Sequence, residues 1–136
     1  MAKTFNLFIS HSWSYSDAYD KLCSLLDNAR YFSYKNYSVP KNDPVHGAAN
    51  TQELYDAIRK QMGYSHVVLI MAGKYSTYSK WINREIKCAS NDLSKPIIGV
   101  IPWANTQVSS VVKENADEMV KWNTNSIVRA IRELAN

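Results

Sequence analysis

Apolar runs and amphipathic segments alternate along the chain, a pattern that predicts strands separated by helices. The clearest elements are two continuous apolar runs at 66–71 and 96–101. Such runs are typical of parallel strands that helices cover on both faces. A shorter run predicts a first strand at 5–9, a Tyr-rich segment predicts an edge strand at 31–38, and a last short strand is expected at 118–122.

The segments between these runs carry apolar residues at three- and four-residue spacing, as amphipathic helices do. Leu54, Ile58 and Met62 form one such stripe. Their helix is expected to begin at Asn50, where Glu53 three residues later makes a pattern similar to a capping box. The other predicted helices cover 15–29, 79–91, 107–116 and 124–135.

Five strands alternating with helices predict a three-layer α/β/α fold with a parallel sheet. Right-handed crossovers favour the flavodoxin-like strand order 2-1-3-4-5, and 136 residues are enough for a single domain. In such a sheet, ligands bind beyond the carboxyl ends of the strands, near the first and third strands. We expect three segments to meet there: residues 10–12, the Pro-containing loop at 39–50, and residues 74–85.

Composition and motifs exclude several classes of function. The net charge is +4, but the basic residues are scattered and form no stripe of the kind that binds nucleic acid. No apolar stretch reaches the roughly 20 residues of a membrane span, and no signal peptide is evident. Cys23 and Cys88 show no metal or redox spacing. We therefore expect a cytoplasmic protein with no membrane partner, no nucleic-acid partner and no metal site.

Known cofactor and nucleophile motifs do not occur in the chain. GxGxxG, GxxxxGK[ST], HExxH and GxSxG are all missing from the sequence. Their absence argues against a Rossmann dinucleotide site, a P-loop, a zinc protease and a nucleophile-elbow hydrolase. We expect no bound cofactor.

The helix predicted at 79–91 is the most informative segment. At 100° per residue, Ile82, Ile86 and Ala89 share the face toward the sheet, whereas Asn83, Arg84 and Lys87 share the face toward solvent. Trp81, Glu85 and Cys88 form a third stripe at the boundary between them. An aromatic face and a carboxylate one turn apart suit a ligand site. The alternative interpretation is that Trp81 seals the helix start and Glu85 is solvated or paired with a lysine.

Three segments resemble the TIR-like family. Leu-Phe-Ile-Ser-His-Ser at 7–12 is similar to the first-strand signature of TIR domains, and Ser79-Lys-Trp81-x-x-x-Glu85 resembles the segment with their tryptophan and catalytic glutamate. Residues 116–128 resemble a bacterial subfamily, the ThsB type of Thoeris antiphage defence. The resemblance implies a flavodoxin-like fold, NAD as substrate, and release of nicotinamide. It also implies an ADP-ribose-derived product, cyclised or conjugated, that activates a partner effector.

The resemblance assigns roles to individual residues. Glu85 is the expected catalytic carboxylate, which would stabilise an oxocarbenium-like ribose, and Trp81 would stack on nicotinamide or ribose. The other predicted substrate-binding residues are Ser10, His11, Ser12, Asn42, Asp43 and Tyr78. The 39–50 loop corresponds to a segment that mediates TIR assembly, so self-association is expected on activation. His46 and His66 are interpreted as structural.

Two other functions fit the same residues. One is a TIR-like interaction module that assembles without chemistry, in which Glu85 would have no catalytic role. The other is an enzyme resembling nucleoside deoxyribosyltransferases, which also use a glutamate on a related fold.

Overall fold

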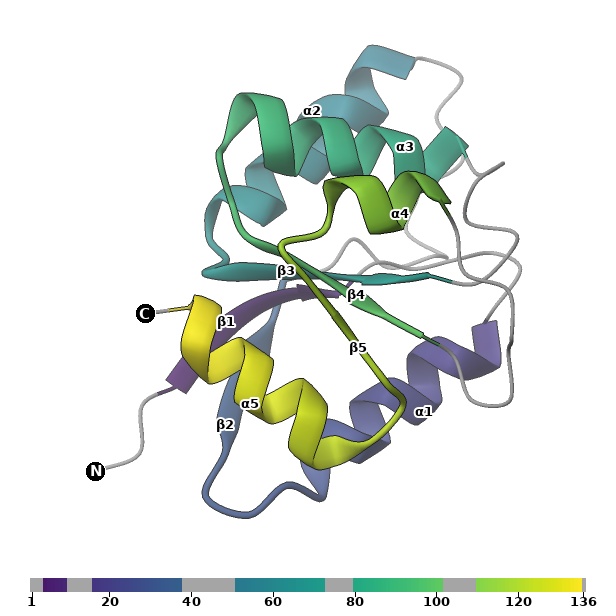
Figure 1. Ribbon diagram of the computed structural model, residues 1–136. Coiled ribbons are helices and arrows are strands. Elements are labelled where there is room, and N and C mark those ends of the chain that lie inside the picture. The colour runs from purple at the N-terminus through teal and green to yellow at the C-terminus, as the bar shows by residue number, and fades with distance from the viewer. Residues whose placement is uncertain (1–3, 10–15, 38–50, 73–79, 102–109, 136) are drawn as a thin grey trace.

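A five-stranded parallel sheet forms the centre of the molecule (Figure 1). The computed structural model describes residues 4–9, 16–37, 51–72, 80–101 and 110–135. Within these ranges the strand order is β2-β1-β3-β4-β5, which confirms the predicted topology. The strands are β1 (Thr4–Ile9), β2 (Ser33–Asn36), β3 (Val67–Met71), β4 (Ile97–Val100) and β5 (Glu118–Val120).

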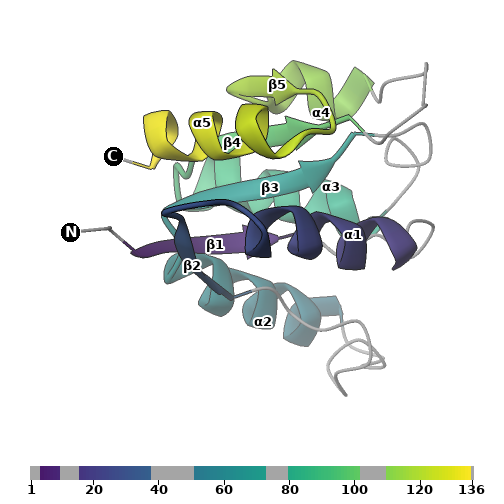
Figure 2. The ribbon, with the colours of Figure 1, turned by 90° about the horizontal axis from the view of Figure 1, so that it is seen from below.

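Helices cover both faces of this sheet. One face carries α1 (Ser16–Asp27) and α5 (Thr124–Leu134), which lie nearest the viewer in Figure 2. The other face carries α2 (Thr51–Gly63), α3 (Lys80–Lys87) and α4 (Ser110–Asn115). The predicted three-layer α/β/α architecture is therefore confirmed.

The continuous apolar runs reflect two separate cores, one on each face of the sheet. Leu7 and Ile9 of β1 pack with α1 and α5, whereas Phe8 between them packs with α2, α3 and α4. This alternation follows from the two-residue period of a strand. Every residue of β4 is buried for the same reason. A strand covered on both faces needs apolar residues at odd and even positions alike.

The predicted edge strand at 31–38 is shorter than expected and lies at the edge of the sheet, as β2. Three of its four residues are exposed. Tyr34 is half-buried, and its hydroxyl donates to Asp27 Oδ1 at 2.8 Å. Phe32 stacks between Phe5 and Tyr34, with ring centroids 5.6 and 5.9 Å away. Aromatic packing thus attaches this polar strand to the core.

Side-chain oxygens fix the start of α5. Asn123 is its N-cap, and its side-chain oxygen accepts a hydrogen bond from the backbone N–H of Ser126 at 2.8 Å. An N-cap of this type satisfies one of the amides that a helix start leaves without a partner. The hydroxyl of Thr124 donates to Leu25 O at 3.3 Å, which links α5 to α1.

The helix predicted at 79–91 is not a single α-helix. It is α3 followed by the π-helix η4 (Cys88–Asp92). The backbone N–H of Leu93 donates to Cys88 O, five residues earlier, at 3.0 Å. This wider turn is the rare π geometry, which keeps Cys88 and Ala89 buried while the chain turns toward β4.

Candidate active site

The carboxyl ends of β1 and β3 meet at one edge of the sheet because the two strands are parallel neighbours. Ile9 ends β1 and Met71 ends β3. Hydrogen bonding continues beyond the strands: Ala72 N donates to Val100 O at 2.8 Å, and Ile101 N donates to Val120 O at 2.9 Å. The backbone at the described strand ends is thus hydrogen-bonded to neighbouring strands. Along the chain, the predicted site segments begin just after β1 and β3.

Most of the predicted substrate-binding residues lie outside the described residues. They are Ser10, His11, Ser12, Asn42, Asp43 and Tyr78, and the 39–50 loop and the cap at Asn50 lie outside as well. Trp81 belongs to the first turn of α3, but its side chain is not among those described. Their roles stay predictions.

Glu85 lies in the second turn of α3 and is buried, with 1% of its surface exposed. This position is deeper than the boundary expected from the helical pattern. Its neighbours Ile86 and Cys88 are buried too, in the core that α2, α3 and α4 share. Asn83 and Lys87 are exposed, as predicted. Helix packing on this face therefore covers two of the three stripes of α3 and η4.

Two charged side chains, Arg59 and Glu85, act on the buried thiol of Cys88. Burial raises the pKa of the Cys88 thiol, and the negative charge of Glu85 raises it further. The guanidinium of Arg59, on α2, opposes both effects and lowers the pKa. A cation of α2 and the carboxylate of α3 thus both act on this buried thiol.

A buried carboxylate has strong electrostatic effects on anything that contacts it. Glu85 interacts with its protein surroundings, as a buried charge requires. Away from bulk water the effective dielectric constant falls, so each charge interacts more strongly with its neighbours. Chemically, Glu85 can stabilise a developing positive charge or hold a hydroxyl group of a ligand.

The hydrogen bonds of His66 confirm its predicted structural role. The backbone N–H of Asn6 donates to His66 Nδ1 at 3.0 Å, and His66 N donates to Asn6 O at 2.6 Å. The imidazole therefore extends the pairing between the start of β3 and β1, with Nδ1 as the acceptor. His46 lies outside the described residues.

Within the described ranges, no three His, Cys, Asp or Glu side chains gather in a way that could hold a metal ion. None of the described helices combines the length and the apolar character that a membrane crossing needs.

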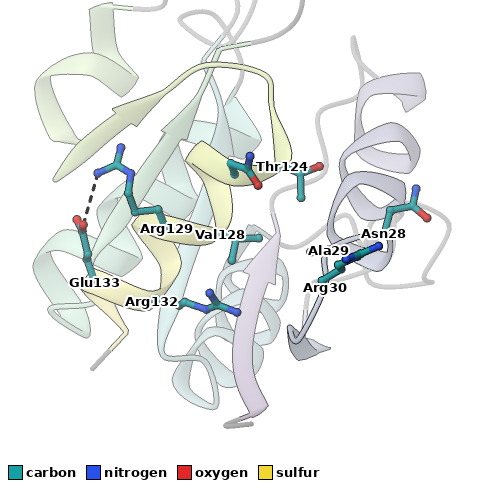
Figure 3. Close-up of a pocket in the computed structure, with 9 residues that line it drawn as sticks. Asn28, Ala29, Arg30, Thr124, Val128, Arg129, Arg132 and Glu133 are labelled. Carbon is teal, nitrogen blue, oxygen red and sulfur yellow. Dashed lines mark hydrogen bonds and ion pairs between the residues drawn. The ribbon is translucent and has the colours of Figure 1, made fainter.

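A cleft of about 510 Å³ lies between the end of α1 and the first three turns of α5 (Figure 3). It is on the opposite face of the sheet from Glu85, and the sequence reasoning did not predict it. The available signal was the pair Arg129 and Arg132, three residues apart on the last helix, together with Arg30 just after the first.

The comparisons with known proteins place the chain in a family. A family model described as "Thoeris protein ThsB, TIR-like domain" matches residues 8–107. The crystal structure of a prokaryotic SEFIR domain is similar, with a TM-score of 0.53, 16% sequence identity and coverage of 96% of each chain. That likeness supports the fold alone. No curated protein sequence matches the chain. Because the family model spans most of the sequence and its fold is observed, the chain belongs to the TIR-like domain family of the Thoeris protein ThsB.

Proposed function

We propose that this protein cleaves NAD in antiphage defence, releasing nicotinamide and an ADP-ribose-derived signalling nucleotide. The observation that carries the proposal is Glu85. It matches the glutamate segment of TIR domains, it stands on a helix that follows β3, and the fold holds it in a buried position. NAD is a substrate here, and no bound cofactor is required.

The chemistry follows from the bond that breaks. The glycosidic bond between the ribose C1′ and the nicotinamide nitrogen breaks, and nicotinamide leaves as a neutral molecule with the electron pair. Positive charge passes to the ribose as an oxocarbenium ion. The carboxylate of Glu85 would stabilise this charge more strongly than the ground state, which is the requirement for catalysis. Water, or a nucleophilic atom of the same or a second molecule, then bonds to C1′ and loses a proton.

The burial of Glu85 sets a condition on this mechanism. NAD has to reach the carboxylate from the carboxyl edge of the sheet, where residues 10–15 follow β1 and residues 73–79 follow β3. Ser10, His11, Ser12, Tyr78, Asn42, Asp43 and Trp81 are the proposed contacts for the ribose, phosphates and nicotinamide. Self-association, with a contribution from the 39–50 loop, would assemble the active form, and the product would reach a separate effector protein.

The second candidate is a non-catalytic TIR-like module that acts by assembly. The burial of Glu85 favours it, because a carboxylate engaged within the protein can serve packing alone. The two candidates differ in one consequence: only the enzyme consumes NAD.

The test is to incubate purified protein with NAD at low and high protein concentration and to separate the products by chromatography and mass spectrometry. The enzyme releases nicotinamide and an ADP-ribose-derived product in equal amounts, with turnover per chain that rises as the chains associate. A protein-free filtrate of the reaction, applied to lysate of the same host, then tests for an activated effector. Intact NAD at all concentrations, together with unchanged NAD in phage-challenged cells, would favour the assembly module.

A further inference from the structure

The cleft between α1 and α5 is lined by more positive than negative charge. Three arginines, Arg30, Arg129 and Arg132, line it together with one acidic residue, Glu133. Arg129 Nη1 lies 3.4 Å from Glu133 Oε1, and both side chains are more than half exposed. That exposed pair contributes little binding energy. Arg30 and Arg132 add two further positive charges to the lining.

Arg132 is held in place by the turn that follows α1. Its Nη2 donates to the carbonyl oxygen of Tyr31 at 2.9 Å, and its guanidinium carbon lies 5.9 Å from the centre of the Phe32 ring. Tyr31 has a positive φ of 57°, and its side chain is 87% exposed. A left-handed conformation is uncommon for a bulky residue and has to be stabilised by its surroundings. The hydrogen bond from Arg132 is one such stabilising contact.

Arg30 lines the other wall of the cleft. It lies between the end of α1 and Tyr31, whereas Arg132 comes from α5 (Figure 3). Among the residues that the structure describes, Arg30 has no hydrogen-bond or ion-pair partner. Ala29 and Val128 add apolar surface to the lining, and Thr124 and Asn125 add polar groups. The lining thus combines two cations with a small apolar surface.

We propose that this cleft binds a phosphate-bearing small molecule of about nucleotide size. Guanidinium groups match the oxygens of phosphate in charge and geometry, and they do so better than ammonium groups. The volume of about 510 Å³ lies within the range of known small-molecule pockets. A simple inorganic ion would leave the apolar part of the lining unused. The site is separate from Glu85, because the whole sheet lies between them.

The test uses ADP as the probe, followed by backbone-amide NMR of the labelled protein and by calorimetry. We expect ADP to shift the amide signals of residues 29–30 and 124–129, adenosine to cause no shift, and pyrophosphate to bind more weakly than ADP. Arg30→Gln should weaken ADP binding at least about tenfold, the effect of losing one charged hydrogen bond. Lys113→Gln is the matched control, since it removes the same charge from α4 on the other face and should leave the affinity unchanged.

The variants also separate this proposal from the proposed function. Arg30 is exposed, so Arg30→Gln should fold normally, and Arg132→Lys tests the second cation with its charge retained. Glu85→Gln should not change the amide shifts that ADP induces around the cleft, whatever its effect on NAD cleavage. Three results would overturn the proposal: no shift at millimolar ADP, equal binding of adenosine or pyrophosphate and ADP, or equal losses in Arg30→Gln and Lys113→Gln.

Discussion

Gly99 offers a sharp test of how closely the layers pack around β4. Its neighbour across the strand pair is Met119 of β5. A methyl group added at Gly99 would overlap the Met119 sulfur, and it would lie 3.2 Å from Met119 Cε and 3.0 Å from Val112 Cγ1. Met119 is partly exposed and can move, but Val112 is fully buried. Glycine is needed at position 99 because the Met119 side chain occupies the space that a Cβ atom would fill.

The net effect of Gly99→Ala combines two opposing terms. Overpacking costs about 1–3 kcal/mol, whereas replacing glycine by alanine restricts the unfolded chain and contributes about 0.4–1 kcal/mol. We expect the free energy of unfolding to fall by about 1–2 kcal/mol, with a decrease in Tm of about 4 °C for each kcal/mol. The control is Gly63→Ala at the end of α2, where an added methyl group meets no atom within 4 Å and φ is not positive.

The assay is urea denaturation followed by circular dichroism, on both single variants and on Gly99→Ala combined with Met119→Ala. Gly63→Ala should be neutral or stabilising by up to about 1 kcal/mol. In the Met119→Ala background, the loss caused by Gly99→Ala should shrink by at least about 0.5 kcal/mol, since contacting residues are energetically coupled. Wild-type stability of Gly99→Ala, or an unchanged loss in the Met119→Ala background, would refute the packing argument.

Three further predictions concern stability and reactivity. Burial and its hydrogen bond raise the pKa of Tyr34, so wild-type stability should fall as the pH rises above about 10, where the unfolded phenol ionises. In urea titrations, the free energy of unfolding should decrease less between pH 9 and pH 11 for Tyr34→Phe than for wild type. An identical decrease would show that Tyr34 does not cause the pH dependence. Asn123→Ala should lose about 1 kcal/mol from the α5 cap, against little change for Asn125→Ala, in thermal denaturation. Cys88, buried and with a raised pKa, should react with a disulfide reagent only on unfolding, whereas the half-buried Cys23 should react in the folded protein.

The strands and their order could be predicted because their sequences repeat a simple physical rule. The run at 96–101 is apolar at every position, and β4 is buried at every position. The run at 66–71 corresponds to β3 in the same way. Parallel strands joined by helices have few allowed topologies, so the order followed.

The π-helix at Cys88–Asp92 could not be predicted from the pattern. A segment of only five residues is too short to distinguish an α-helix from a π-helix by its hydrophobic pattern. Cys88 and Ala89 would each face nearly the same direction in both helix types. The burial of Glu85 was also missed, for a related reason. A helical wheel gives the angle of a side chain, but the depth of that side chain depends on neighbouring helices from distant parts of the sequence.

Among the predicted site residues, Glu85 is the one whose side chain the structure describes. The other candidates lie outside the described residues or, like Trp81, have no described side chain, so their roles stay predictions. The cleft at Arg30 and Arg132 was missed because its two walls come from opposite ends of the chain.

The proposed role of Glu85 in NAD cleavage is tested best by measuring nicotinamide release from Glu85→Gln and wild type under the same conditions. Glutamine has nearly the same size and helix propensity and can form hydrogen bonds, so folding should be retained, as checked by circular dichroism. Glu114→Gln, an exposed position on α4, is the matched control and should keep wild-type turnover. We expect Glu85→Gln to reduce turnover by about a hundredfold or more, with a much smaller change in NAD binding. A folded Glu85→Gln variant that releases nicotinamide at the wild-type rate would overturn the catalytic assignment of Glu85.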